Sequence, residues 1–134
     1  MKIYIATPVN GRSEATLEEK RLAAYYRMCE IRKQLHWKFP DAEFHSSFDE
    51  HIAPIRRDRF DIEWYEATII GRCVTEVMNC DAILMDWGYE QSKGCTVEHT
   101  TALTYGKKII HAFDLDIEPE RGVELGYVQH FDND

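Results

Sequence analysis

Residues 81–113 read DAILMDWGYEQSKGCTVEHTTALTYGKKIIHAF and contain a complete strand–helix–strand unit. The apolar run at residues 81–85 predicts a buried strand. A turn-like segment follows it, a helix is expected over residues 96–105, and Gly106 ends that helix. Residues 108–113 predict a second strand. A crossover helix between two strands indicates a parallel pair within an α/β sheet.

The same alternation runs through the rest of the chain. Further strands are expected at residues 2–6 and 42–47, and further helices at residues 14–35 and 62–78. Ser13 is the expected N-cap of the first of these helices, and residues 48–59 are expected to form a charged, irregular loop. Because strands alternating with helices indicate βαβ units, the pattern predicts an α/β domain with a mainly parallel sheet of four to five strands.

The composition indicates one folded domain of 134 residues, with 44% hydrophobic and 30% charged residues. We expect residues 1–113 to form the α/β domain. The acidic residues 114–134 are expected to extend it, either as a short strand and tail or by packing against a partner chain. No apolar run approaches the ~20 residues of a membrane span, and the start MKIYIATPVN lacks the features of a signal peptide. A cytoplasmic protein without a membrane partner is therefore expected.

The formal net charge of −8 argues against a nucleic acid polymer as partner, because phosphate backbones bind clustered Lys and Arg. A small anionic ligand is compatible with this charge, since it needs only a local site such as a helix N-terminus. The four cysteines form no C-x-x-C pair, and the six histidines show no spacing typical of a metal site. The segment HSSFDEH suggests one only weakly. We expect neither a metal nor a cofactor.

In an open α/β sheet, ligands bind beyond the carboxyl ends of the strands. Three loops would meet there: TPVNGR after the first strand, HSSFDEH after the second and DWGYEQSKG after the third. In the last loop, Asp86 follows the strand directly, and Trp87 offers a surface on which a nucleobase could stack or the loop could pack. Ser92 and Gly94 precede the helix, where free backbone N–H groups can cap the helix and bind a phosphate.

Glu98 follows Gly94 by four residues and is the strongest candidate for chemistry. Helix side chains tilt toward the N-terminus, so its carboxylate can point back to the pocket, and the positive helix end favours its ionised form. An ionised carboxylate on a rigid helix suits a nucleophile. A capping or solvated surface glutamate is the alternative reading of the same residue.

These elements resemble the nucleoside 2-deoxyribosyltransferase superfamily, and most closely its 2'-deoxynucleoside 5'-phosphate N-hydrolases and an uncharacterised branch. The resemblance rests on the opening IYIATPVNG, the strand CDAILM, the Ser-x-Gly-x-x-x-Glu element at residues 92–98 and the KKII strand. It covers most of residues 2–113. It implies a three-layer flavodoxin-like or Rossmann-like fold, an N-glycosidic substrate and a homodimer or larger homo-oligomer.

The resemblance also implies roles for particular residues. Glu98 matches the family's nucleophilic glutamate, and Tyr4 matches a tyrosine that supports it. Ser92 matches a serine that binds the 5'-phosphate in the hydrolase branch, which favours a nucleotide over a free nucleoside. The other positions that the resemblance assigns to ligand binding are Thr7, Asn10 and Gly11 in the first loop and His45 in the second strand.

The sequence departs from the family at one position. An aspartate is usual eight residues before the one that opens the third strand, and here that position holds Cys73. A thiol is a poor substitute for a carboxyl group in moving protons. Asp86, or otherwise Glu90, is the expected replacement acid. Cys73 is either a neutral core residue or a changed site residue.

Two functions follow as hypotheses. The first is cleavage or transfer at the N-glycosidic bond of a small nucleoside or nucleoside 5'-monophosphate, through a covalent glycosyl intermediate on Glu98. The second is a nucleotide-binding protein with little or no catalysis, because of Cys73. A third, weaker hypothesis is an assembly subunit that associates through the acidic residues 114–134.

Overall fold

The computed structural model describes residues 1–56, 59–60 and 66–120. Its elements follow in the order β1 (Lys2–Ala6), α1 (Leu17–Lys38), β2 (Glu43–Ser46), β3 (Ile55–Arg56), β4 (Arg59–Phe60), α2 (Glu66–Asn79), β5 (Ala82–Met85), the 3-10 helix η1 (Tyr89–Gln91), α3 (Lys93–Thr104), β6 (Lys108–His111) and the 3-10 helix η2 (Ala112–Leu115). Within the described residues, no helix combines the length and the apolar character that a membrane span requires.

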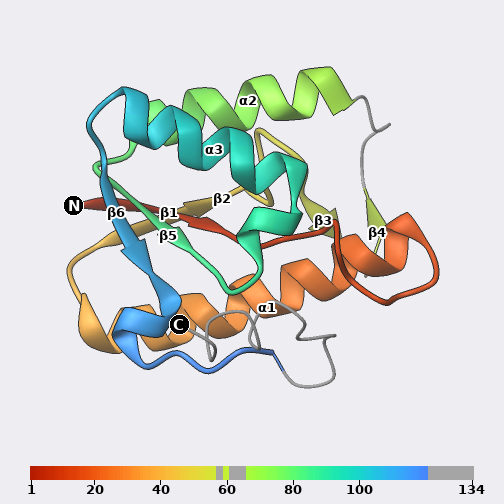
Figure 1. Cartoon of the computed structure of the whole chain (residues 1–134), viewed down its shortest axis with the longest axis horizontal. Coiled ribbons are helices and arrows are strands. Elements are labelled where there is room, and N and C mark those ends of the chain that lie inside the picture. Colours follow the sequence, from red (N-terminus) through yellow and green to blue (C-terminus); the bar gives the residue numbers. More distant parts are fainter. Residues whose placement is uncertain (57–58, 61–65, 121–134) are drawn as a thin grey trace.

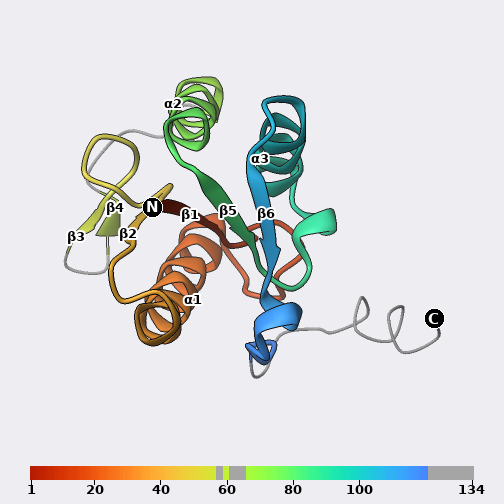
Figure 2. The same cartoon turned by 90° about the vertical axis from the view of Figure 1, so that its left-hand side faces the viewer.

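Four strands form a parallel sheet in the order β2-β1-β5-β6. Helix α1 covers one face of this sheet, and α2 and α3 cover the other (Figures 1 and 2). The predicted three-layer α/β architecture with a mainly parallel sheet is therefore confirmed. The strands β3 and β4 pair separately as a short antiparallel ladder, within a segment that was expected to be irregular.

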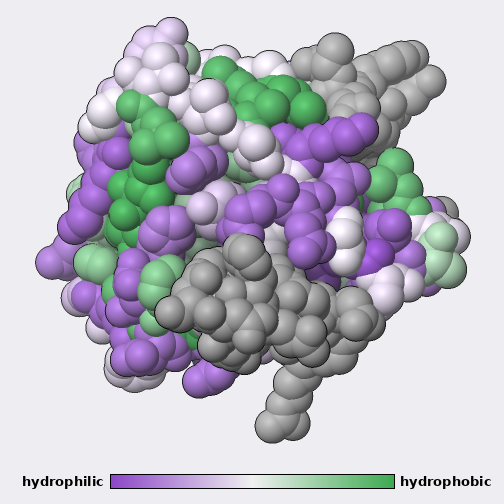
Figure 3. All heavy atoms as spheres, viewed as in Figure 1, coloured by the Kyte–Doolittle hydropathy of each residue, from purple (hydrophilic) through white to green (hydrophobic). Residues whose placement is uncertain are grey.

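Alternation along β1 divides the core between the two faces. Ile3 and Ile5 point to the α1 side, where they join Met28 and Ile31 of that helix. Tyr4 and Ala6 point to the other side and join buried residues of α2 and α3. The outer surface seen in the first view is largely hydrophilic, with hydrophobic side chains in separate patches (Figure 3). The two-sided burial explains why the strand reads as a continuous apolar run.

The described part of the C-terminal extension packs against the same core. Ile117 is buried among the residues on the α1 face. The Trp87 indole Nε1 donates a hydrogen bond to its carbonyl oxygen at 2.7 Å, and an arginine of α1 binds the carbonyl oxygen of Glu118. The strand predicted over residues 108–113 ends at His111, and η2 follows it; the described residues 114–120 contain no strand. The rest of the predicted tail lies outside the described residues.

Helix α1 starts later than predicted. It begins at Leu17, and Thr16 rather than Ser13 is its N-cap, because the Thr16 hydroxyl accepts a hydrogen bond from the backbone N–H of Glu19 at 3.1 Å. Helix α3 starts earlier than predicted, at Lys93, with Ser92 as its cap. Helix α2 is described from Glu66, so the earlier part of its predicted range lies outside the described residues.

We expect Thr16→Ala to lower the free energy of unfolding by about 1 kcal/mol, because the substitution removes the acceptor for one free helix N–H group. Ser13→Ala is the matched control and should change stability by no more than a few tenths of a kcal/mol. Chemical denaturation of the two variants and the wild type measures both values. Equal losses in the two variants would show that the cap has been assigned to the wrong residue.

Candidate active site

A cavity of about 320 Å³ opens at the carboxyl end of β1, on the face covered by α2 and α3. In the sheet, β2 lies on one side of β1, and β6 lies on the opposite side of β5, so the strand order reverses direction between β1 and β5. A reversal of this kind makes the crevice between β1 and β5 the usual ligand site of an open α/β sheet. Residues from β1, the loop after it and the three helices line the cavity.

Glu98 of α3 lies at this cavity and is only 6% exposed. Its carboxylate oxygen Oε2 accepts a hydrogen bond from the phenol of Tyr4. Burial raises the pKa of Glu98 to about 7, although hydrogen bonds from Tyr4 and Cys73 act in the opposite direction. A substantial ionised fraction at neutral pH is what a carboxylate nucleophile requires.

Tyr4 fixes the position of this carboxylate. The side chain is fully buried, and burial together with the nearby Glu98 charge raises its pKa well above the usual value. Tyr4 therefore keeps its proton and acts as a hydrogen-bond donor throughout the physiological range. It comes from the strand next to β5, whereas Glu98 comes from the helix after β5.

Cys73 of α2 lies beside the same pair and is buried. Burial and the Glu98 charge raise the pKa of its thiol to about 12. At neutral pH it is a protonated thiol, and its hydrogen favours the ionised form of the neighbouring Glu98. With this pKa it is a poor proton donor for a leaving group, since an efficient general acid has a pKa near the working pH.

Arg21 of α1 also lines the cavity, and the sequence interpretation missed it. The side chain is buried, and burial lowers its pKa to about 10, which still leaves it charged at neutral pH. Helical spacing could have predicted its burial, because Arg21 shares the helix face of Ala24, Met28 and Ile31, all of which are buried. A buried cation on the same cavity as Glu98 is a candidate contact for a leaving group or an anionic ligand.

The N-terminus of α3 forms a second wall of the cavity. The Ser92 hydroxyl accepts a hydrogen bond from the backbone N–H of Cys95 at 3.4 Å and retains its own hydrogen to donate. The Lys93 backbone N–H donates to Asn10 Oδ1 at 3.2 Å, which ties the first loop to this helix. A Cβ added at Gly94 would meet no atom within 4 Å, so a ligand can approach the backbone there.

Six of the ten predicted site residues line this one cavity: Tyr4, Thr7, Asn10, Ser92, Gly94 and Glu98. The Thr7 hydroxyl donates to the carbonyl oxygen of Ala24 at 3.3 Å, so it also fastens the first loop to α1. Further lining residues that were not predicted are Ser47, Ile69, Ile70 and the exposed Lys93. The remaining predicted residues lie elsewhere.

Asp86 does not reach the cavity, and the interpretation of it as the replacement acid needs correction. Its carboxylate binds the guanidinium of Arg27 through two hydrogen bonds, of 2.9 and 3.0 Å, on the α1 side of the sheet. Both side chains are almost fully buried, and Asp86 also accepts from the backbone N–H of Trp87 at 2.8 Å. A carboxylate fixed in this way is a structural anchor for the chain after β5.

Trp87 and Gly11 lie beside a separate hollow of about 20 Å³, too small for a nucleobase. Trp87 packs against the core on the α1 side, with its ring 6.0 Å from that of Phe113. Gly11 has a φ of +85°, and an added Cβ would come within 3.0 Å of Gln91. The structure thus gives both residues roles in packing and in the turn after β1, and it places neither next to Glu98.

His45 lies at the outer edge of the sheet, where it contacts Glu43, Asp49 and Glu76. It does not line the cavity of Glu98. The predicted contact between His45 and the base is therefore not supported by its position.

Residues 55–111 match a family model described as "Domain of unknown function (DUF4406)". No curated protein matches the sequence. A solved structure described as "2-desoxiribosyltransferase from Leishmania mexicana" is similar over 92% of this chain and 77% of that chain, with 22% sequence identity and a TM-score of 0.52. This likeness confirms at the level of the fold the resemblance to deoxyribosyltransferases predicted from the sequence.

Proposed function

We propose that this protein cleaves or transfers the N-glycosidic bond of a small nucleoside or nucleoside 5'-monophosphate. One observation carries the proposal: the buried Glu98 carboxylate, held by Tyr4, faces a cavity of suitable size at the switch point of the sheet. A nucleophilic carboxylate needs a fixed position and an accessible space for the sugar. The likeness in fold to a 2-desoxiribosyltransferase supports the same class of reaction.

In the proposed reaction, one Glu98 carboxylate oxygen attacks C1' of the sugar, and the C1'–N bond breaks with its electron pair passing to the base. The Tyr4 hydrogen bond holds the carboxylate in place for this attack. Attack by water on C1' then breaks the glycosyl ester, releases the sugar or its 5'-phosphate with a 1'-hydroxyl and restores the carboxylate, while the proton lost by the water neutralises the departed base. Attack by a second base instead transfers the sugar.

The N-terminus of α3 is proposed to hold the 5' end of the substrate. The Ser92 hydroxyl and the open backbone at Gly94 lie on the same cavity as Glu98. Lys93 at the mouth and the positive end of α3 would both favour a phosphate over a neutral hydroxyl. This arrangement supports a nucleoside 5'-monophosphate as the substrate class.

The departing base needs a proton or strong hydrogen bonds, and Glu98 is the one carboxyl that lines the cavity among the described residues. Arg21 is the strongest hydrogen-bond donor that remains, and we propose that it contacts the departing base. A guanidinium stabilises developing negative charge without transferring a proton, so we expect slow turnover with ordinary purines and pyrimidines.

Incubation with a panel of deoxynucleoside 5'-monophosphates, and of nucleosides together with acceptor bases, tests the proposal. Chromatographic detection of free base or of an exchanged nucleoside supports it. The alternative function, nucleotide binding with little catalysis, is favoured by the thiol of Cys73 and its pKa of about 12. Calorimetry separates the two: tight binding of a nucleotide without any product identifies a binding protein, and the absence of both excludes the two functions.

Cys73→Asp should raise kcat roughly 100-fold if the missing acid limits the rate, since a positioned general acid contributes about 10²–10⁴. Burial beside Glu98 would raise the pKa of the new carboxyl and keep it protonated, as an acid catalyst requires. Cys73→Ser is the matched control, because it changes the sulfur to oxygen without adding an acid. Unchanged or lower rates in a folded Cys73→Asp variant would show that the base leaves without help from this position.

A further inference from the structure

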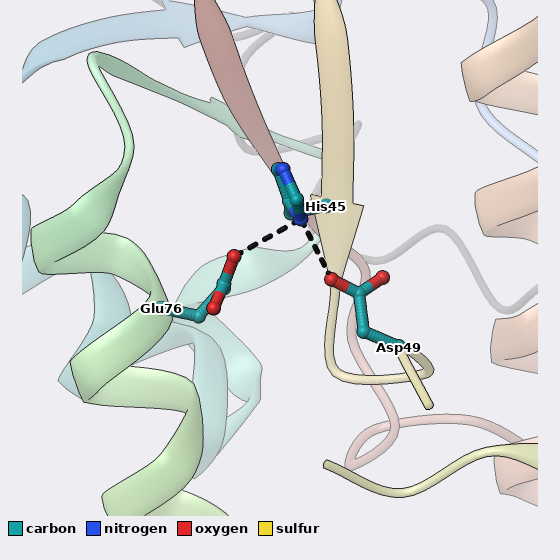
Figure 4. A group of neighbouring side chains, drawn as sticks. All are labelled: His45, Asp49 and Glu76. Carbon is teal, nitrogen blue, oxygen red and sulfur yellow. Dashed lines mark hydrogen bonds and ion pairs between the residues drawn. The ribbon is translucent and has the colours of Figure 1, made fainter. Parts of the chain in front are cut away.

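Three side chains converge outside the cavity of Glu98, at the edge of the sheet formed by β2. His45 Nδ1 lies 2.8 Å from Asp49 Oδ2 and 3.0 Å from Glu76 Oε1 (Figure 4). One nitrogen and two carboxylate oxygens from these residues lie within 4.8 Å of one another. None of the three residues lines the cavity of Glu98, so this group is separate from the proposed active site.

The fold holds each member of the group in place. His45 is the register partner of Tyr4 across β1 and β2, so its side chain projects to the face that α2 covers, where Glu76 meets it. Asp49 follows in the turn after β2, where its Oδ1 accepts from the backbone N–H of Ser46 at 3.2 Å. This bond leaves its other oxygen, Oδ2, directed at His45.

A second layer of contacts orients the groups that face the centre. Glu43 Oε1 lies 2.9 Å from His45 Nε2, so it can accept the Nε2 hydrogen while Nδ1 binds an ion. Nδ1 itself faces the two carboxylates of Asp49 and Glu76. His51 Nε2 lies 2.9 Å from the second oxygen of Glu76. Metal-binding histidines and carboxylates in proteins have outer partners of this kind.

The contacts at His45 Nδ1 are more than one proton can satisfy. A ring nitrogen carries a single hydrogen, yet two carboxylate oxygens lie within 3.0 Å of it. Adjacent ligand atoms around a cation at about 2.1 Å are themselves about 3.0 Å apart when they lie at right angles. A metal ion in the space between the three atoms would accept all of them at once, and small movements of the side chains would admit it.

The charge of this group also favours a bound cation. Glu43, Asp49 and Glu76 place three carboxylates around two imidazoles, and the Glu76 side chain is only 10% exposed. Three carboxylates outnumber the two imidazoles, so the group carries an excess of negative charge in any protonation state of the rings, partly screened from water. The His51 and Glu43 side chains on the outside are each 60% exposed, so a cation and its water molecules have a route to the centre.

We propose that His45, Asp49 and Glu76 bind one divalent transition-metal ion, with water in the remaining coordination positions. A set of one imidazole and two carboxylates suits Zn²⁺ or Mn²⁺, and the imidazole disfavours Mg²⁺. The ion would tie the turn after β2 to α2, and so hold the edge strand to the helix layer. The site is a structural one, and the inference does not depend on the proposed glycosidase activity.

The test uses the full-length, untagged protein, freed of metal with a chelator and then titrated with ZnCl₂, MnCl₂ or MgCl₂ at neutral pH. We expect one Zn²⁺ or Mn²⁺ per chain by calorimetry, with Zn²⁺ bound more tightly. At a hundredfold excess over Kd, Tm should rise by roughly 10 °C. Asp49→Asn and Glu76→Gln keep the side-chain shape and should each weaken binding at least about tenfold.

His36→Gln is the matched control, because His36 is an exposed histidine of α1 outside this group and should not change binding. No heat and no change in Tm with either transition metal would overturn the proposal. So would unchanged affinity in the folded Asp49→Asn and Glu76→Gln variants. Titration with Co²⁺ gives a second readout: an intense near-ultraviolet sulfur-to-metal band would place the ion at a cysteine instead. A response to MgCl₂ as large as that to ZnCl₂ would overturn the choice of a transition metal.

Discussion

Glu98→Gln should lower kcat at least about 1000-fold for any nucleoside or nucleotide that the wild type cleaves, because an amide oxygen cannot form the glycosyl ester. The substitution keeps the side-chain shape, so the cavity should keep its ligand affinity within a few fold. Release of free base, followed by chromatography, measures the rate, and calorimetry measures the affinity. Glu90→Gln is the matched control: Glu90, the second acid suggested by the sequence, is an exposed residue of η1 that does not line the cavity, and we expect unchanged turnover.

The raised pKa of Glu98 also predicts how activity and stability depend on pH. For an ionised nucleophile with a pKa of about 7, kcat/KM should rise roughly tenfold per pH unit below pH 7 and level off above it. Stability should run in the opposite direction. The folded pKa exceeds the ordinary value of 4.5, so the stability of the wild type falls as the pH rises from 4.5 to 7.

Glu98→Gln removes this ionisation, so its stability relative to the wild type should improve by about 3 kcal/mol between pH 4 and pH 8. Urea denaturation at the two pH values measures the change. A variant that loses activity and gains stability at high pH identifies a carboxylate kept in an unfavourable environment for function. Turnover retained by Glu98→Gln would contradict the mechanism, and a pH-independent stability difference would contradict the raised pKa.

Asp86→Ala should cost about 3–5 kcal/mol of stability, because it leaves the buried guanidinium of Arg27 without its buried carboxylate partner and only the exposed Glu30 beside it. In a domain of this size the corresponding fall in Tm is roughly 10 °C or more. The pair is held by two hydrogen bonds and is almost completely removed from water, which distinguishes it from a surface ion pair. Thermal denaturation followed by circular dichroism measures the effect.

Asp114→Ala provides the matched control, since Asp114 is an exposed carboxylate in η2, and we expect a change within about 0.5 kcal/mol. Replacing both members of the pair, Arg27→Met with Asp86→Leu, should recover much of the lost stability. Asp86→Asn separates structure from catalysis. If that variant kept its Tm and lost kcat by a factor of about 1000, Asp86 would be a catalytic acid after all.

The fold was predictable because the strongest signals are local. The apolar runs of β1 and β5, the acidic first turn of α1 and the cap at Ser92 all act within a few residues along the chain. The strand-end rule then brought Thr7, Asn10, Ser92, Gly94 and Glu98 to one edge of the sheet. The start of α1 was not fixed by the sequence alone, because Ser13 and Thr16 can both cap a helix and only the fold selects between them.

The error at Asp86 has a simple geometric cause. Leu84 points to the α1 side and Met85 to the α2 and α3 side, so alternation returns Asp86 to the α1 side. Counting this alternation along β5 would have placed it away from Glu98. The burial of its partner Arg27 and of the cavity residue Arg21 was not predictable in this way. An arginine on a helix is expected to be exposed unless the surface packed against it is known.

His45 illustrates what the sequence could not supply. The segment HSSFDEH contains two of the three proposed metal-binding residues, but Glu76 comes from α2, after two short strands. Spacing along the sequence cannot predict that a helix residue from elsewhere in the chain will lie beside the residues of a turn. The homo-oligomeric state, the cytoplasmic location and the role of the acidic extension stay predictions.

The pairing of Tyr4 with Glu98 has a consequence for how the proposed active site forms. The two residues are 94 positions apart, and β1 lies inside the sheet between β2 and β5. Contacts across such separations form late and slowly, because the intervening chain must lose its freedom before they are gained. During synthesis, the backbone groups of β1 that face β5 can form their sheet hydrogen bonds only after β5 has been made. We therefore expect the pair of Tyr4 and Glu98 to form in the last stage of folding, and a nascent or truncated chain that lacks α3 should be inert toward nucleotides.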